Sequence, residues 1–139
     1  MKGRAVTVRM VNPHEVSFAG EGLSGCREAR LTVRPRRVRG SAGDGQRYET
    51  HVEVEGPRHV IEIDSEDAGA AKVGLGDRGA LSFEVEKADG SGTVSVSAGN
   101  AVVVGQKTRF LNETEGVSVT TVRFLCQLGW DGSEPVSIG

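Results

Sequence analysis

Alternating apolar and polar residues between Gly79 and Leu128 constrain the fold of this chain more than any other feature. Leu81, Phe83 and Val85 alternate with Ser and Glu, which is the two-residue period of a strand with one buried face. The Asp-Gly-Ser-Gly sequence at 89–92 then predicts a turn, after which the alternation resumes. Together these patterns predict the core of an antiparallel β domain.

The alternation is interrupted at two places. Gly99-Asn100 separates one alternating segment from the apolar run 101–104, and Val119 and Val122 lie on opposite phases. Because one extra residue in a strand exchanges its two faces, the change of phase predicts a bulge or a sharp twist near Thr120-Thr121.

Shorter segments before this stretch also have the strand pattern. We expect strands at 4–11, 15–19, 27–33, 48–54 and 59–63. In the third of these, Ala29, Leu31 and Val33 are expected to point into the core and Arg30 and Thr32 away from it.

Only residues 64–72 favour a helix. Asp64 or Ser65 would cap its first turn, and the acidic residues that follow suit the positive end of the helix dipole. The predicted fold is therefore all-β, a mostly antiparallel sandwich or small barrel, with one short flanking α-helix. With 139 residues we expect a single domain, 1–139, with a long flexible loop around 35–48 that could also be the tip of a hairpin.

The cysteines and the hydropathy indicate where the chain is made. Cys26 and Cys126 do not form a disulfide framework, and we expect free thiols in a reducing compartment. The N-terminus does not resemble a signal peptide, and no apolar run approaches the ~20 residues of a membrane span. We therefore expect synthesis in a cytoplasm and no membrane partner.

The net charge of −2 conceals opposed blocks of charge. Residues 1–40 contain nine basic and three acidic residues, a net charge of +6, whereas residues 41–100 contain five and twelve, a net charge of −7. Residues 101–139 contain three and four, a net charge of −1. Such blocks lie on different faces, neutralise each other within the molecule, or neutralise each other between molecules.

The residues that carry chemistry do not form a recognisable catalytic motif. His51 and His59 could face each other across a hairpin with Glu53 nearby, but we interpret them as surface residues rather than metal ligands. The glycine-rich segment 40–45 lacks the Lys-Ser/Thr end of a phosphate-binding loop. The basic run at 34–39 has no interleaved aromatic residues for base stacking. We expect no enzyme, no metal and no cofactor.

The last 80 residues or so resemble the tail tube proteins of long-tailed bacteriophages and related phage-tail-like particles. The resemblance depends on a strand that continues into a short acidic-capped segment, on the hairpin that follows, and on a strand with a DG…PV ending. The segments that carry it are 59–67, 79–85, 97–104, 121–125 and 130–136. The first half of the chain departs more freely from the family pattern.

The resemblance implies a virion structural protein. Its subunits would form six-membered rings that stack into a conduit for DNA ejection, so its partners would be further copies of itself and other tail proteins. Double-stranded DNA would pass without specific binding, and the protein would be located in the virion tail and, during assembly, in the host cytoplasm. Alternatives are another virion part (a tail terminator, baseplate tube or capsid decoration protein) and a non-viral β-sandwich binding module.

Two sets of residues are candidates for these contacts. An acidic channel lining would repel DNA phosphates, and its candidates are Glu53, Glu55, Glu62, Glu84 and Glu86. The basic block and the loop after it would contact the next subunit or ring, and the candidates are Arg34, Arg36, Arg37, Arg39, Asp44 and Arg47.

Overall fold

The computed structural model describes residues 6–34, 37–41, 51–55, 58–66, 73–87, 89–112, 117–129 and 134–139. Within these residues the chain is all-β, as predicted, and contains no helix. The strands are β1 (Val6–Val11), β2 (His14–Phe18), β3 (Glu21–Leu23), β4 (Cys26–Arg34), β5 (Arg37–Ser41), β6 (His51–Glu55), β7 (Arg58–Ser65), β8 (Arg78–Glu86), β9 (Thr93–Asn112), β10 (Val117–Cys126) and β11 (Ser137–Ile138).

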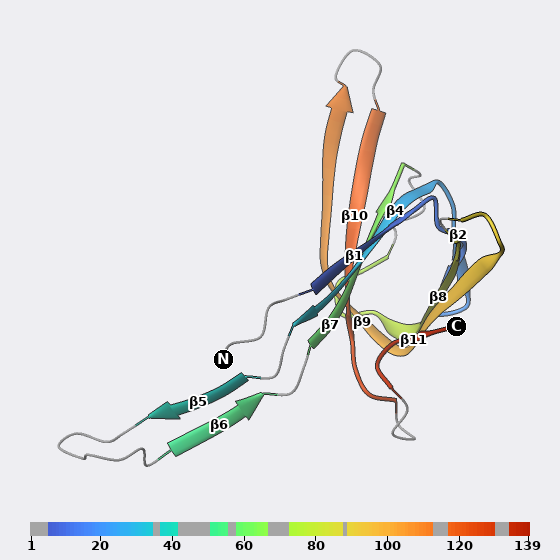
Figure 1. Ribbon diagram of the computed structural model, residues 1–139. Helices are drawn as coiled ribbons and strands as arrows, with labels where there is room; N and C mark the ends of the chain where they lie inside the picture. The colour runs from blue at the N-terminus through green and yellow to red at the C-terminus, as the bar shows by residue number, and fades with distance from the viewer. Residues whose placement is uncertain are drawn as a thin grey trace.

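One antiparallel sheet contains nine of these strands, in the order β1-β4-β7-β10-β9-β8-β2-β3, with β11 paired to β9. The 20-residue strand β9 joins two parts of it, because residues 93–102 pair with β8 and residues 101–112 pair with β10. We name β1, β4, β7, β10 and the second half of β9 the first lobe. The first half of β9 with β8, β2, β3 and β11 is the second lobe, which curls around at the right of Figure 1.

The bend in β9 begins at the interruption that the sequence shows at Gly99-Asn100. Ala98 pairs with Leu81 and Ala101 pairs with Gly79, so Gly99 and Asn100 form a bulge within one continuous strand. The buried Asn100 side chain donates a hydrogen bond to the carbonyl of Leu128 (3.1 Å). Bulges bend and twist a strand, and this one turns β9 from the second lobe into the first.

The prediction of a bulge near Thr120-Thr121 was wrong. Pairing between β10 and β9 is regular from Ser118 to Arg123, and the irregularities lie on either side of that segment. Val119 and Val122 do lie on opposite faces of β10, but both are 1 % exposed. The phase changes because β10 is buried on both faces here: Val119 is on the face of Thr121 and Val122 is on the core-facing side, so no extra residue is needed.

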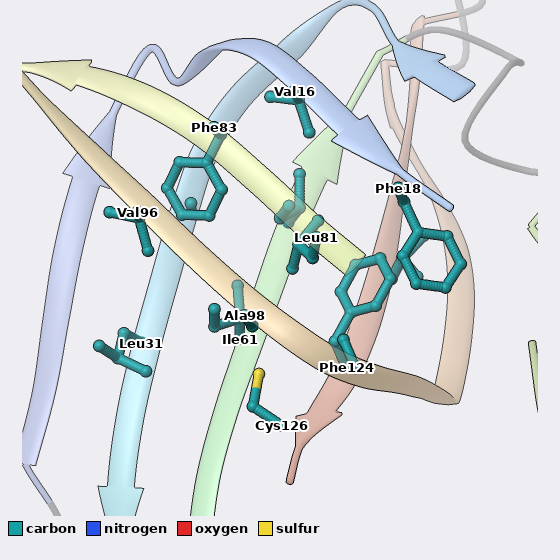
Figure 2. Packing of buried hydrophobic residues seen from close by; sticks show 14 of the residues in the cluster. Val16, Phe18, Leu31, Ile61, Leu81, Phe83, Val96, Ala98, Phe124 and Cys126 are labelled. Carbon is teal, nitrogen blue, oxygen red and sulfur yellow. The ribbon is translucent and has the colours of Figure 1, made fainter. Parts of the chain in front are cut away.

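The core lies between the two lobes (Figure 2). The second lobe contributes Leu81 and Phe83, and the first contributes Ile61, Ile63 and Phe124, all 1 % exposed or less. The Phe18 and Phe124 rings meet with their centroids 4.8 Å apart. Burial of each such side chain stabilises the fold by about 1.5–3 kcal/mol, so the alternation in the sequence identifies the residues that hold the lobes together.

Two predictions about local structure concern β7 and β5. Asp64 and Ser65, the two expected capping residues, are the last residues of β7 and are buried. The rest of the expected helix, 67–72, lies outside the described residues. The loop around 35–48 contains β5, which pairs with β6 as a separate two-stranded sheet that extends away from the lobes (Figure 1).

The cysteines are both free thiols, as predicted. Burial raises the pKa of Cys126 to about 12. Among the described residues, no helix is long and apolar enough to cross a membrane.

Candidate functional site

The outward face of the first lobe holds two rows of polar residues that run across four strands. Arg30, Glu62, Arg123 and Gly105 stand opposite one another on β4, β7, β10 and β9. The second row contains Glu28, Asp64, Thr121 and Lys107 on the same strands. Side chains opposite each other on one face are about 5 Å apart at Cβ, so Glu62 stands between Arg30 and Arg123, and Asp64 stands between Glu28 and Thr121.

Asp64 is the centre of this face. Its side chain is 4 % exposed, and both carboxylate oxygens accept hydrogen bonds from Arg30, from Nη1 to Oδ2 at 2.8 Å and from Nη2 to Oδ1 at 3.0 Å. The Thr121 hydroxyl donates a further bond to Oδ1 (2.6 Å), and Arg109 lies 3.9 Å from Oδ2. The bidentate geometry makes Arg30–Asp64 a strong, oriented ion pair.

The pKa of Asp64 reflects opposing effects. Burial raises it, but the hydrogen bonds from Arg30 and Thr121 and the charges of Arg30 and Arg109 outweigh burial, so the pKa is lowered. The pKa of Arg30 is raised, mainly by its hydrogen bond to Asp64. Both groups are therefore charged at neutral pH.

Glu28 extends the network to the edge of the sheet. It accepts a hydrogen bond from Arg30 (2.8 Å) and forms an ion pair with Arg9 on β1. A chain of alternating charges thus runs from Arg9 through Glu28 and Arg30 to Asp64.

Beside this network the face is hollowed by an open depression of about 400 Å³. Its lining is Arg30, Glu62, Gly105, Gln106, Lys107, Arg109, Thr121 and Arg123. The Arg123 side chain lies beside Gly105, since a Cβ placed there would be 3.4 Å from the Cβ of Arg123 and 3.9 Å from its Cδ. The lining contains four bases and one acid, and Asp64 lies beneath.

The candidate acidic lining is not brought together on one surface. Glu62 lies on the outward face of the first lobe, whereas Glu84 and Glu86 lie on the outward side of β8 in the second lobe. Glu53 and Glu55 are in β6, where the register places them opposite Arg39 and Arg37 of β5. A common channel surface for all five would have to be made between molecules.

The candidate contact residues are also distributed. Arg34 is exposed at the end of β4, opposite Arg58. Arg37 and Arg39 belong to β5, and Arg36, Asp44 and Arg47 lie outside the described residues.

The opposed charge blocks meet within the molecule. Arg30 pairs with Asp64, and Arg27 pairs with Glu66 (3.2 Å). Each pair joins the basic block 1–40 to the acidic block 41–100, which is the intramolecular arrangement among those that the sequence left open.

Sequence reasoning did not identify the bases of the depression. Arg123 lies between the buried Val122 and Phe124, so its outward direction follows from the alternation. Lys107 and Arg109 share the phase of the buried Ala101 and Val103, and they face outward because the register between β10 and β9 shifts between Val103 and Gly105. Their convergence with Arg30 depends on the strand order β4-β7-β10-β9, which the alternation does not specify.

The described residues contain no group of three or more His, Cys, Asp or Glu side chains that could hold a metal ion, so they do not form the histidine cluster considered from the sequence. His59 lies opposite Val33 and Cys126, on the core-facing side of β7. His14 instead approaches Glu84 at 3.6 Å.

Comparisons with protein-family models and with curated proteins found no match to this chain.

Proposed function

We propose that this chain is a virion structural protein, a tail tube subunit that assembles into stacked hexameric rings around a conduit for DNA. The observation that carries the proposal is the open edge of the sheet at β1. Among the described residues β1 pairs only with β4, so one side of its backbone has no strand partner.

Three valines of this edge strand are exposed. Val6 and Val8 stand on the core-facing side, opposite Val33 and Leu31, yet they are 59 % and 47 % exposed. Val11 on the other side is 59 % exposed. Soluble proteins guard such edges with charges, bulges or proline.

The charged residue of this edge already has an ion-pair partner. Arg9 is the only charged residue of β1, and it is paired with Glu28. A strand or sheet of a second copy would complete the hydrogen bonding of β1 and cover its valines. A head-to-tail contact of this kind generates a ring when the rotation closes.

The projecting hairpin and the resemblance of the sequence agree with this role. The β5–β6 sheet extends beyond the lobes (Figure 1) and gives a subunit a means of reaching a neighbour. The six-fold ring and the role as a DNA conduit are what the resemblance to tail tube proteins implies.

The test is negative-stain electron microscopy of the purified protein at raised concentration, with its mass measured by light scattering. We expect hollow tubes or stacked six-fold rings. Val8→Lys is expected to abolish them while leaving the subunit folded by circular dichroism, because Val8 is half exposed.

A matched control is Leu75→Lys, which changes another exposed apolar residue (70 %) away from β1 and is expected to assemble normally. A monomer at every concentration would contradict the proposal and favour a binding module. Trimers or single rings would favour another virion part.

A further inference from the structure

We propose that the depression on the first lobe binds a phosphate group, held by Lys107, Arg109 and Arg123. This inference does not depend on the tail tube proposal, since it rests on the charge and shape of one face of a single subunit.

The charge balance leaves cations available at this site. Asp64 is neutralised by Arg30, whose guanidinium binds both of its oxygens. Lys107 and Arg123 form no ion pair with any residue that the structure describes, and Arg109 only approaches Asp64 at 3.9 Å. With Glu62 as the remaining acid, three available bases leave a local charge of about +2, which favours a doubly charged anion over a single carboxylate.

The geometry brings these bases to one opening. Lys107 and Arg109 are two residues apart on β9, so their side chains leave the same face about 7 Å apart. Arg123 stands opposite Gly105 on the adjacent strand. Gly105 lines the depression together with all three bases. Arginine suits the oxygens of a phosphate because its fork donates two parallel hydrogen bonds.

The lining also indicates which part of a ligand is recognised. No aromatic residue is among the lining residues, so a nucleobase has no ring on which to stack. The site therefore recognises the phosphate itself, whether it is free or part of a polynucleotide backbone.

Calorimetric titration of the purified protein with inorganic pyrophosphate tests the site. We expect saturable binding that weakens at least tenfold in Arg123→Gln and in Lys107→Gln, because each removes a charge-assisted hydrogen bond. Glu62→Gln is expected to strengthen binding several-fold, since it removes the opposing charge. Control variants Arg78→Gln and Lys87→Gln change bases at the two ends of the β8 region, in the second lobe, and are expected to bind as the wild type does.

A short DNA duplex titrated in the same buffer distinguishes the source of the phosphate. Duplex binding that falls with salt and with Arg123→Gln assigns the site to a polynucleotide backbone, whereas pyrophosphate binding alone assigns it to free phosphate. Absence of binding by both probes would overturn the proposal. Binding that the Arg123 and Lys107 variants leave unchanged, in proteins with wild-type circular dichroism, would overturn it equally.

Discussion

The outward faces of the two lobes are both polar, but they are organised differently. On the first lobe, Asp64 is almost fully buried within a network of charged hydrogen bonds. On the second lobe, Ser82 and Glu86 are exposed, and the contacts of Glu84 with the described residues are long, 3.6 Å to His14 and 3.5 Å to Ser95.

The difference arises from the neighbours of each central strand. On β7, Glu62 stands between Arg30 of β4 and Arg123 of β10, and Asp64 in the next row binds Arg30 diagonally. By contrast, β8 stands beside Ser95 and Ser97 of β9. Removing the partner of a buried charge costs more than removing that of an exposed one, because the buried charge cannot be hydrated instead. We infer that charge contributes to the stability of the first lobe and hardly at all to that of the second.

The largest expected effect comes from removing the buried carboxylate. Asp64→Asn should lower the free energy of unfolding by about 3 kcal/mol, because the partly buried Arg30 loses its bidentate partner and is left with its bond to Glu28. Urea denaturation measures this change. The matched substitution on the second lobe, Glu84→Gln, should change it by less than about 0.5 kcal/mol; equal effects would remove the distinction between the lobes.

Acid should weaken the first lobe selectively. The folded pKa of Asp64 lies below its ordinary value of 3.8, so ionised Asp64 stabilises the fold above that value and the contribution is lost as the pH falls through the folded pKa. Wild type should therefore lose stability more steeply than Asp64→Asn below about pH 4. The urea midpoints of both proteins, measured between pH 7 and strong acid, show this difference. Midpoints that fall equally with pH in the two proteins would contradict the inferred titration of Asp64.

A smaller effect is expected at Thr121. Thr121→Val keeps the shape of the side chain but removes the hydroxyl that donates to Asp64 Oδ1. The expected cost is about 1.5–2 kcal/mol, the low end for a hydrogen bond to a charged group. Thr32→Val is the control, since the Thr32 hydroxyl shares an exposed hydrogen bond with Thr7 on the same face. Thermal unfolding compares the two, and a larger loss for Thr32→Val would contradict the central position of Asp64.

The core was predictable from the sequence, because burial of one strand face is a local property. The period of two identified Leu81, Phe83 and Val85 as inward residues, and Ala29 and Leu31 likewise. It failed where β10 is buried on both faces, since Val119 and Val122 then look like a change of phase.

The charged site was not predictable, because its partners are distant in the sequence. An acid followed by Ser, Glu and Asp after an apolar run looks like a helix cap, and this pattern does not indicate that Asp64 binds residues on other strands. The residues that bind it, Arg30 and Thr121, lie 34 and 57 positions away. Only the strand order brings them together.

A double-mutant cycle tests most directly whether the first lobe, unlike the second, is stabilised by charge. It combines Arg30→Gln with Asp64→Asn and, as the reference, His14→Gln with Glu84→Gln, using free energies of unfolding in urea at neutral pH. We expect a coupling energy of about 2–3 kcal/mol for Arg30–Asp64 and less than about 0.5 kcal/mol for His14–Glu84. Similar coupling energies for the two pairs would contradict the account.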